Sequence, residues 1–130
     1  MNYEAALNYA SRRLLDELPK DLFYHGPDHT LSDVLPAVER LGYMHRLDAK
    51  RHNILLTAAA FHDSGYIWQY RANEPLAAKL AMEALPGFDY THDEVEHAAR
   101  IIMATPLVKI GSKIMQSAGD DLLEQVNKDE

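Results

Sequence analysis

Residues 54–65 read ILLTAAAFHDSG, an apolar run that ends abruptly in polar side chains. The apolar residues cover every side of a helix, which is typical of a helix buried on all its faces. Asp48 suits the N-cap of this helix, and Gly65 suits the left-handed residue at which a helix stops. The pattern therefore predicts a central, buried helix with His62 and Asp63 at its C-terminal end, at the edge of the core.

Apolar residues at helical spacing and helix-ending signals predict further helices on both sides of this segment. The expected helices are one over about 3–18 with Leu14 and Leu15 on its apolar stripe, one over about 29–41 with Gly42 as its stop, one opened by Asn73-Glu74-Pro75 and closed by Pro86-Gly87, one headed by a capping box at Thr91–Glu94, and one from near Ser112. No segment alternates apolar and polar residues as a half-buried strand does. The expected fold class is all-α, an irregular bundle of about six helices.

The composition fits one domain over residues 1–130. Hydrophobic residues make up 47% and charged residues 25%, close to the averages of globular domains. Cysteine is absent, which excludes disulfides, thiolate zinc sites and cysteine nucleophiles and favours a reducing cytoplasm. No apolar run reaches the roughly 20 residues that span a bilayer, and the first residues lack the layout of a signal peptide. We expect a cytoplasmic protein without a membrane partner.

The net charge narrows the classes of partner. Lys and Arg number 13 against 20 Asp and Glu, which gives a formal charge of −7. This charge repels a polyanion such as duplex DNA over most of the surface. A small anionic substrate would need local cations or a metal ion.

Side chains of the types that bind divalent ions occur in two separate segments. Neutral imidazole and carboxylate are ligands for zinc, manganese, iron and similar ions, and a hydrolytic metal also needs an open position for water. His29 lies 33 residues before His62 and its neighbour Asp63, so they meet only if the helices that carry them pack as an antiparallel pair. An isolated histidine is more often hydrogen-bonded than metal-bound, and His-Asp pairs also occur by chance. The residues alone leave both interpretations open.

Four segments, in this order, resemble the bacterial hydrolases of the HD superfamily. They are YHGPDHT at 24–30, AAAFHDSGY at 58–66, NE at 73–74 and IIMAT at 101–105, and the similarity spans about residues 20–123. The resemblance implies an HD-domain-like helical fold in which a His, a His-Asp pair and a distant Asp hold a metal ion. It also implies hydrolysis of phosphate esters of nucleotides or related metabolites.

The resemblance assigns the metal ligands residue by residue. His29 matches the first ligand, and His62 and Asp63 match the signature pair. Asp121 is the best local match to the distant Asp, with Asp120 as the alternative. Relatives commonly continue beyond this point with further helices, so we expect a member that is shortened at its C-terminus relative to them.

Asn73 stands where many relatives of this type carry a histidine. An amide is a poor metal ligand but a good helix N-cap. We therefore expect one divalent ion, Mn, Mg, Zn, Fe or Ni, rather than two. Glu74, the next residue, is expected to support the metal site from outside or to contact substrate.

Other side chains are candidates for proton transfer or substrate contact. Asp63 could hold both the metal and the attacking water, and His25 is the nearest candidate for the general acid, because imidazole changes charge near neutral pH. Tyr24 and Lys109 are candidate substrate contacts. The alternative for Lys109, and for Lys113 beside it, is an ordinary solvated lysine.

The remaining aromatic and histidine side chains have two interpretations each. Tyr66, Trp68 and Tyr70 could stack on a base or sugar, yet aromatic residues after a buried helix more often close the core. His92 and His97 could widen the site, but structural or solvent-facing roles are expected for both.

The function expected from residues and resemblance together is a metal-dependent phosphohydrolase that acts on a phosphate mono- or diester. Its partner is a small phosphorylated substrate, and a homodimer is compatible with the sequence. One alternative is a non-catalytic HD-like domain that binds a metal, a nucleotide or a partner protein. The other is a helical interaction module whose histidines are incidental.

Overall fold

The structure, a computed structural model, describes residues 1–21 and 26–104, and all of its regular secondary structure over these residues is helical. No strand occurs within these two ranges. The five α-helices are α1 (Tyr3–Glu17), α2 (Leu35–Met44), α3 (Ala49–Phe61), α4 (Glu74–Ala84) and α5 (His92–Met103). Three shorter elements join them, the π-helix η1 (His29–Val34) and the 3₁₀ helices η2 (Ser64–Ile67) and η3 (Leu85–Phe88). The all-α prediction is confirmed for these residues, and the helix expected from near Ser112 lies outside them.

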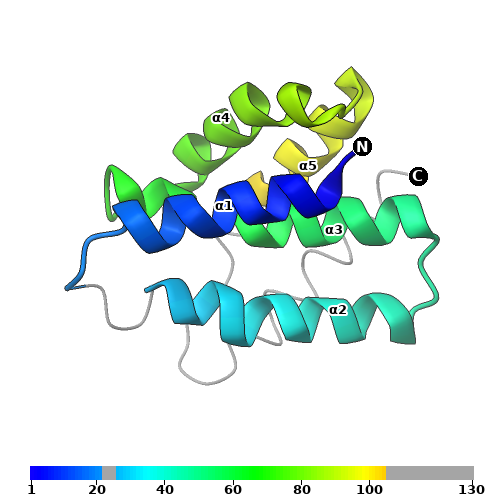
Figure 1. The fold of residues 1–130 in the computed structure, drawn as a ribbon, viewed down its shortest axis with the longest axis horizontal. Coiled ribbons are helices and arrows are strands. Elements are labelled where there is room, and N and C mark those ends of the chain that lie inside the picture. The colour runs from blue at the N-terminus through cyan, green and yellow to red at the C-terminus, as the bar shows by residue number, and fades with distance from the viewer. Residues whose placement is uncertain (22–25, 105–130) are drawn as a thin grey trace.

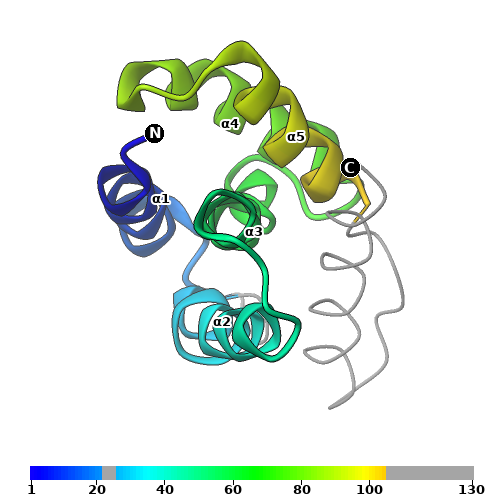
Figure 2. The same cartoon turned by 90° about the vertical axis from the view of Figure 1, so that its right-hand side faces the viewer.

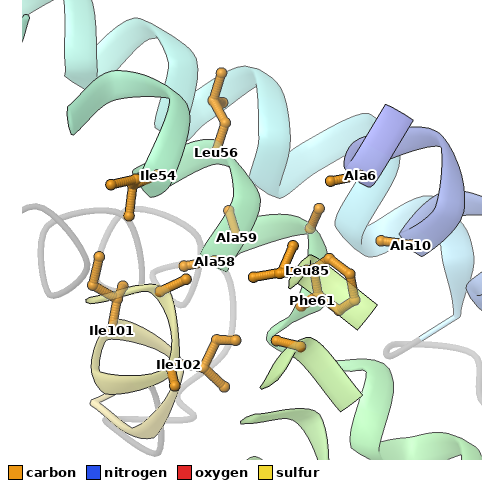
Figure 3. Packing of buried hydrophobic residues seen from close by; sticks show 14 of the residues in the cluster. Ala6, Ala10, Ile54, Leu56, Ala58, Ala59, Phe61, Leu85, Ile101 and Ile102 are labelled. Carbon is orange, nitrogen blue, oxygen red and sulfur yellow. The ribbon is translucent and has the colours of Figure 1, made fainter. Parts of the chain in front are cut away.

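Helix α3 lies at the centre of the molecule, as its apolar sequence predicts. Figure 2 shows it nearly end-on, with α1, α2 and α5 on different sides of it. Every residue of its second half, from Ile54 to Phe61, is buried. Figure 3 shows Ala6 and Ala10 of α1 on one side of α3 and Ile101 and Ile102 of α5 on the other. The Asp48 cap is also confirmed, because its side chain accepts a hydrogen bond of 2.9 Å from the Arg51 backbone.

Helices α2 and α3 form an antiparallel pair joined by a short turn (Figure 1). The prediction that Gly42 ends α2 is wrong, because the helix continues to Met44 and the left-handed residue of the turn is Arg46, at φ 55°. Gly42 is buried, and a Cβ atom there would lie 2.5 Å from Nδ1 of His52 on α3. Glycine at this position lets the His52 ring pack closely against α2, and it does not form the turn.

The segment before α2 differs from the single helix expected over 29–41. Residues 29–34 are wound as a π-helix, in which the Leu35 N–H donates to the Thr30 carbonyl five residues earlier. Pro36 has no N–H to donate, and its ring crowds the carbonyl four residues before it. The wider turns of η1 accommodate this proline. The first residue of η1 is His29.

Helix α1 packs on α3 through small residues. Its buried side chains are those of Ala6, Ala10 and Leu14. Leu15, which the sequence places on the apolar stripe, is 59% exposed, because residue 14 already occupies the face toward the core. The helix stops at Glu17, one residue before the expected end.

The capping box predicted for α5 is confirmed. The Thr91 hydroxyl accepts from the Glu94 backbone at 3.2 Å, and the Glu94 carboxylate accepts from the Thr91 backbone at 2.8 Å. Helix α4 starts at Glu74 as expected, but the chain continues past its end into η3, and Asp89 at φ 65° is the left-handed residue that follows. None of the described helices is long and apolar enough to cross a membrane.

Tyr90 makes the stability of the fold depend on pH in the alkaline range. Burial raises the pKa of Tyr90 to about 12, an effect only partly offset by the hydrogen bond of 2.6 Å between its hydroxyl and Thr57. In the unfolded chain the pKa is about 10. The folded state thus keeps a proton that the unfolded state loses, so this contribution is complete below about pH 10 and is lost as the pH rises towards 12.

We expect the free energy of unfolding to fall more steeply between about pH 9 and 11.5 in the wild-type protein than in Tyr90→Phe. Urea denaturation at a series of pH values measures both slopes. Equal slopes in the two proteins would contradict the assignment to Tyr90.

Candidate metal centre

Three side chains distant in sequence come together at the C-terminal end of α3. His29 is the first residue of η1, His62 caps α3, and Asp63 directly precedes η2. One ligand atom from each lies within 4.8 Å of the other two, and all three residues are buried. The convergence expected from the antiparallel packing of α2 and α3 is therefore confirmed, and the group could hold a metal ion.

The distances within the group suit a single divalent cation. Oδ2 of Asp63 lies 3.6 Å from Nε2 of His29 and 3.3 Å from Nε2 of His62. Ligand atoms about 2.1 Å from one tetrahedral ion lie about 3.4 Å from each other. The planes of the two imidazole rings lie at 56° to each other, and the ring centroids are 6.3 Å apart.

The hydrogen bond that His62 makes on the far side of its ring is also compatible with a cation at this place. Nδ1 of His62 donates a hydrogen bond to the backbone carbonyl of Ala59, which can only accept. The proton of the neutral ring is then on Nδ1, and Nε2 presents a lone pair towards Oδ2 of Asp63. Two acceptors that face each other at 3.3 Å need a proton or a metal cation between them. Such a hydrogen bond from the far ring nitrogen is typical of metal-binding histidines.

The electrostatic surroundings of the three side chains also favour a cation. The side chains of His29, His62 and Asp63 are only 5%, 7% and 9% exposed, so a charge on the carboxylate is poorly solvated and would attract a cation strongly. The C-terminus of a helix carries a partial negative charge of about half an elementary charge. A cation at the end of α3 would be stabilised by the Asp63 carboxylate and by the partial negative charge of the helix end.

The chain turns sharply here without leaving its carbonyl groups unpaired. The carbonyl of Phe61 accepts from Ser64 Oγ at 2.7 Å, and that of Asp63 accepts from the Tyr66 backbone at 3.1 Å. The carbonyl between them, that of His62, accepts from Nδ2 of Asn73 at 3.2 Å. The turn that presents the two ligands is thus held at three successive carbonyls.

The prediction of a left-handed stop at Gly65 is wrong. Gly65 is part of η2 and shows no positive φ, and the chain leaves α3 through 3₁₀ geometry instead. Glycine is required for a different reason, because a Cβ atom at this position would lie 1.9 Å from the Asn73 carbonyl oxygen. The start of α4 therefore lies directly against the turn that follows the His-Asp pair.

Asn73 is the residue of the site that sequence reasoning missed. The sequence predicts it as an N-cap, and it does occupy that position in α4, but its side chain makes no capping hydrogen bond. The amide donates to the His62 carbonyl instead, and the residue is only 1% exposed. Its place immediately before a helix start concealed this role, because N-cap asparagines are common.

Several predicted site residues lie outside the described part of the chain. These are Tyr24, His25, Lys109, Lys113, Asp120 and Asp121. Glu74 is described, and it lies buried in the first turn of α4, next to Asn73. The proposed roles of all these residues stay predictions.

The remaining aromatic and histidine candidates divide between core and surface. Tyr66 is buried with Leu14 and Leu18 and so closes the core. Trp68 is 52% exposed, with the Arg13 guanidinium 5.7 Å from its ring centroid. The His92 side chain is 83% exposed, which confirms a solvent-facing role for it.

Comparison with known proteins identifies no relative, since no family model matches the chain and neither a curated protein nor a solved structure matches it. The assignment of a function therefore depends on the residues and geometry of the site itself.

Proposed function

We propose that this chain is a metal-dependent phosphohydrolase of the HD type, which hydrolyses a phosphate mono- or diester of a nucleotide or related metabolite. The observation that carries the proposal is the pair of facing acceptors in the core, Nε2 of His62 and Oδ2 of Asp63, with His29 beside them. Two imidazoles and one carboxylate are a donor set that divalent ions of catalytic centres accept. The order of the sequence motifs supports the reaction class.

The ligands proposed for one Mn, Mg, Zn, Fe or Ni ion are His29, His62 and Asp63, with Asp121 or Asp120 as a fourth. When bound, such an ion supplies Lewis acidity towards a phosphoryl oxygen and towards a water molecule. Asp63 has a second carboxylate oxygen with which it would orient the attacking water.

The proposal assigns proton transfer and substrate binding to four further residues. His25 would protonate the leaving alcohol as general acid. Tyr24, Glu74 and Lys109 would contact the substrate, with the Lys109 ammonium as a point charge for a phosphate oxygen. A small phosphorylated substrate fits the net charge of −7 better than a polyanion does.

The proposal is tested by a screen of nucleotides and generic phosphodiesters with protein purified without a histidine tag. The protein is stripped with a chelator and reloaded with each of the five metals in turn. We expect turnover with at least one metal, and its loss in Asp63→Asn, which keeps the shape of the side chain but removes a charged ligand. Asp93→Asn, on the exposed first turn of α5, is the matched control and should keep full activity.

Two outcomes of this screen would contradict the proposal. One is hydrolysis that survives both chelation and Asp63→Asn. The other is a wild-type protein that binds none of the metals.

One observation favours a second candidate, a non-catalytic domain that keeps the metal for structure. The three candidate ligand side chains are no more than 9% exposed, whereas a catalytic metal must keep an open position for water or substrate. Metal binding that stabilises the fold, without turnover of any phosphoester, would select this candidate over the enzyme.

A further inference from the structure

We infer that Asn73 is a positioning residue of the metal centre, whose amide fixes the directions in which His62 and Asp63 face the cation. The inference rests on the proposed function to the extent that a cation binds at these residues. It assigns to Asn73 an effect on metal affinity and coordination geometry, although its side chain need not touch the metal.

Asn73 holds the peptide group between the two candidate ligands His62 and Asp63. The carbonyl of His62 belongs to the peptide unit that joins His62 to Asp63, and Nδ2 of Asn73 donates to that carbonyl at 3.2 Å. A peptide unit is planar, so the only soft backbone rotations between the two residues are those on either side of it. Holding the carbonyl oxygen restricts both rotations and hence the angle between the two ligand side chains.

Adjacent residues on a regular helix point about 100° apart, because there are 3.6 residues per turn. His62 and Asp63 nevertheless bring Nε2 and Oδ2 to 3.3 Å from each other. The peptide between them must be set for this convergence, since His62 keeps helical angles and Asp63 does not, at φ −99° and ψ 4°. The bond from Asn73 is made at the point where the helix geometry changes.

Asn73 is itself anchored by its backbone. Its carbonyl accepts the first hydrogen bond of α4 from the Ala77 backbone at 2.9 Å. The same carbonyl lies against Gly65, where a Cβ atom would come within 1.9 Å of it. Helix α4 is thus docked on η2, and the Asn73 side chain extends from this fixed position to the His62 carbonyl.

The choice of an amide at a buried position also points to a specific role. Oδ1 of Asn73 is buried and has no hydrogen-bond partner among residues 1–21 and 26–104. Burying an unpaired acceptor is unfavourable, whereas an apolar side chain of similar size would avoid that cost. An apolar side chain could not supply the Nδ2 donor of this amide, which bonds to the His62 carbonyl.

The test measures metal affinity and coordination rather than turnover. Mn²⁺ and Co²⁺ are titrated calorimetrically into chelator-stripped wild-type protein, Asn73→Ala and Asn73→Leu, and visible spectra of the Co²⁺ forms are recorded. We expect both variants to bind each metal about 10–100-fold more weakly, the usual effect of losing an outer-shell hydrogen bond. We also expect shifted Co²⁺ absorption bands. Asn73→Leu keeps the number and branching of the side-chain heavy atoms, so it leaves no cavity and provides a second variant if Asn73→Ala fails to fold.

The matched control is Thr57→Val, which removes another buried side-chain hydrogen bond of α3. The Thr57 hydroxyl bonds to Tyr90 at 2.6 Å and to the Asn53 carbonyl at 2.7 Å, and the residue takes no part in the turn after α3. This variant should be less stable to urea but should bind Mn²⁺ and Co²⁺ like the wild-type protein.

Two results would overturn the inference. If the Asn73 variants lose stability as Thr57→Val does but keep the wild-type dissociation constants and Co²⁺ spectrum, Asn73 is only a structural residue, and the proposed function stands. If the wild-type protein binds neither of these metals nor any of the five metals of the activity screen, the proposed function fails and the inference fails with it. The titration of the wild-type protein alone distinguishes the two cases.

Discussion

Gly65→Ala is expected to lower the free energy of unfolding by at least about 3 kcal/mol, near the upper end of the range for overpacking. The new methyl group would lie 1.9 Å from the Asn73 carbonyl oxygen and 2.7 Å from its carbonyl carbon. These are backbone atoms in the first turn of a helix, so no flexible side chain can move aside. Helix α4 would have to separate from η2, which breaks the contact beside the candidate metal centre.

Urea denaturation measures this change, with Gly87→Ala as the matched control. Gly87 is also in a 3₁₀ helix, η3, and a Cβ atom there meets nothing within 4 Å. We expect the control to change stability by no more than about 0.5 kcal/mol. A Gly65→Ala protein as stable as the Gly87→Ala protein would contradict the close approach of α4 to the turn after α3.

His29→Gln is expected to weaken binding of a divalent metal by more than about a hundredfold, which exceeds the effect of losing an outer hydrogen bond. The amide keeps the residue polar but is a much poorer ligand than imidazole. A metal that binds only the folded state raises its thermal midpoint. The wild-type midpoint should therefore rise with added Mn²⁺ or Zn²⁺, and that of His29→Gln should not.

Thermal unfolding with and without the metal provides this measurement. His92→Gln makes the same substitution at an exposed histidine on α5, so its midpoint should rise with metal as the wild-type midpoint does. An equal metal-induced rise in His29→Gln would show that His29 is not a ligand. It would also remove the only contribution of η1 to the candidate site.

The central helix could be predicted from sequence because it follows from a simple pattern, whereas the meeting of His29 with His62 and Asp63 is expected from the resemblance together with an antiparallel packing of the helices that carry them. A helix that is apolar on all sides must be buried, and its first polar residues must lie where it leaves the core. The cap at Asp48 and the capping box at Thr91 are local signals that depend on only a few neighbouring residues.

The errors concern residues whose roles depend on contacts across the fold. Gly42 and Gly65 look like helix stops, but each is a glycine because a partner distant in sequence, His52 or Asn73, lies too close for a Cβ atom. Asn73 looks like an N-cap, but its amide bonds to a carbonyl 11 residues earlier. A sequence pattern shows which face of a helix is apolar and where the helix is capped. Close contacts between residues distant in sequence depend instead on how the helices pack.

Anomalous diffraction from crystals grown with saturating Zn²⁺ is the most direct test of the metal centre. The account predicts a zinc peak about 2.0–2.2 Å from a ring nitrogen of His29, a ring nitrogen of His62 and a carboxylate oxygen of Asp63. Crystals that bind zinc only elsewhere, with these three side chains in contact and no peak between them, would contradict it.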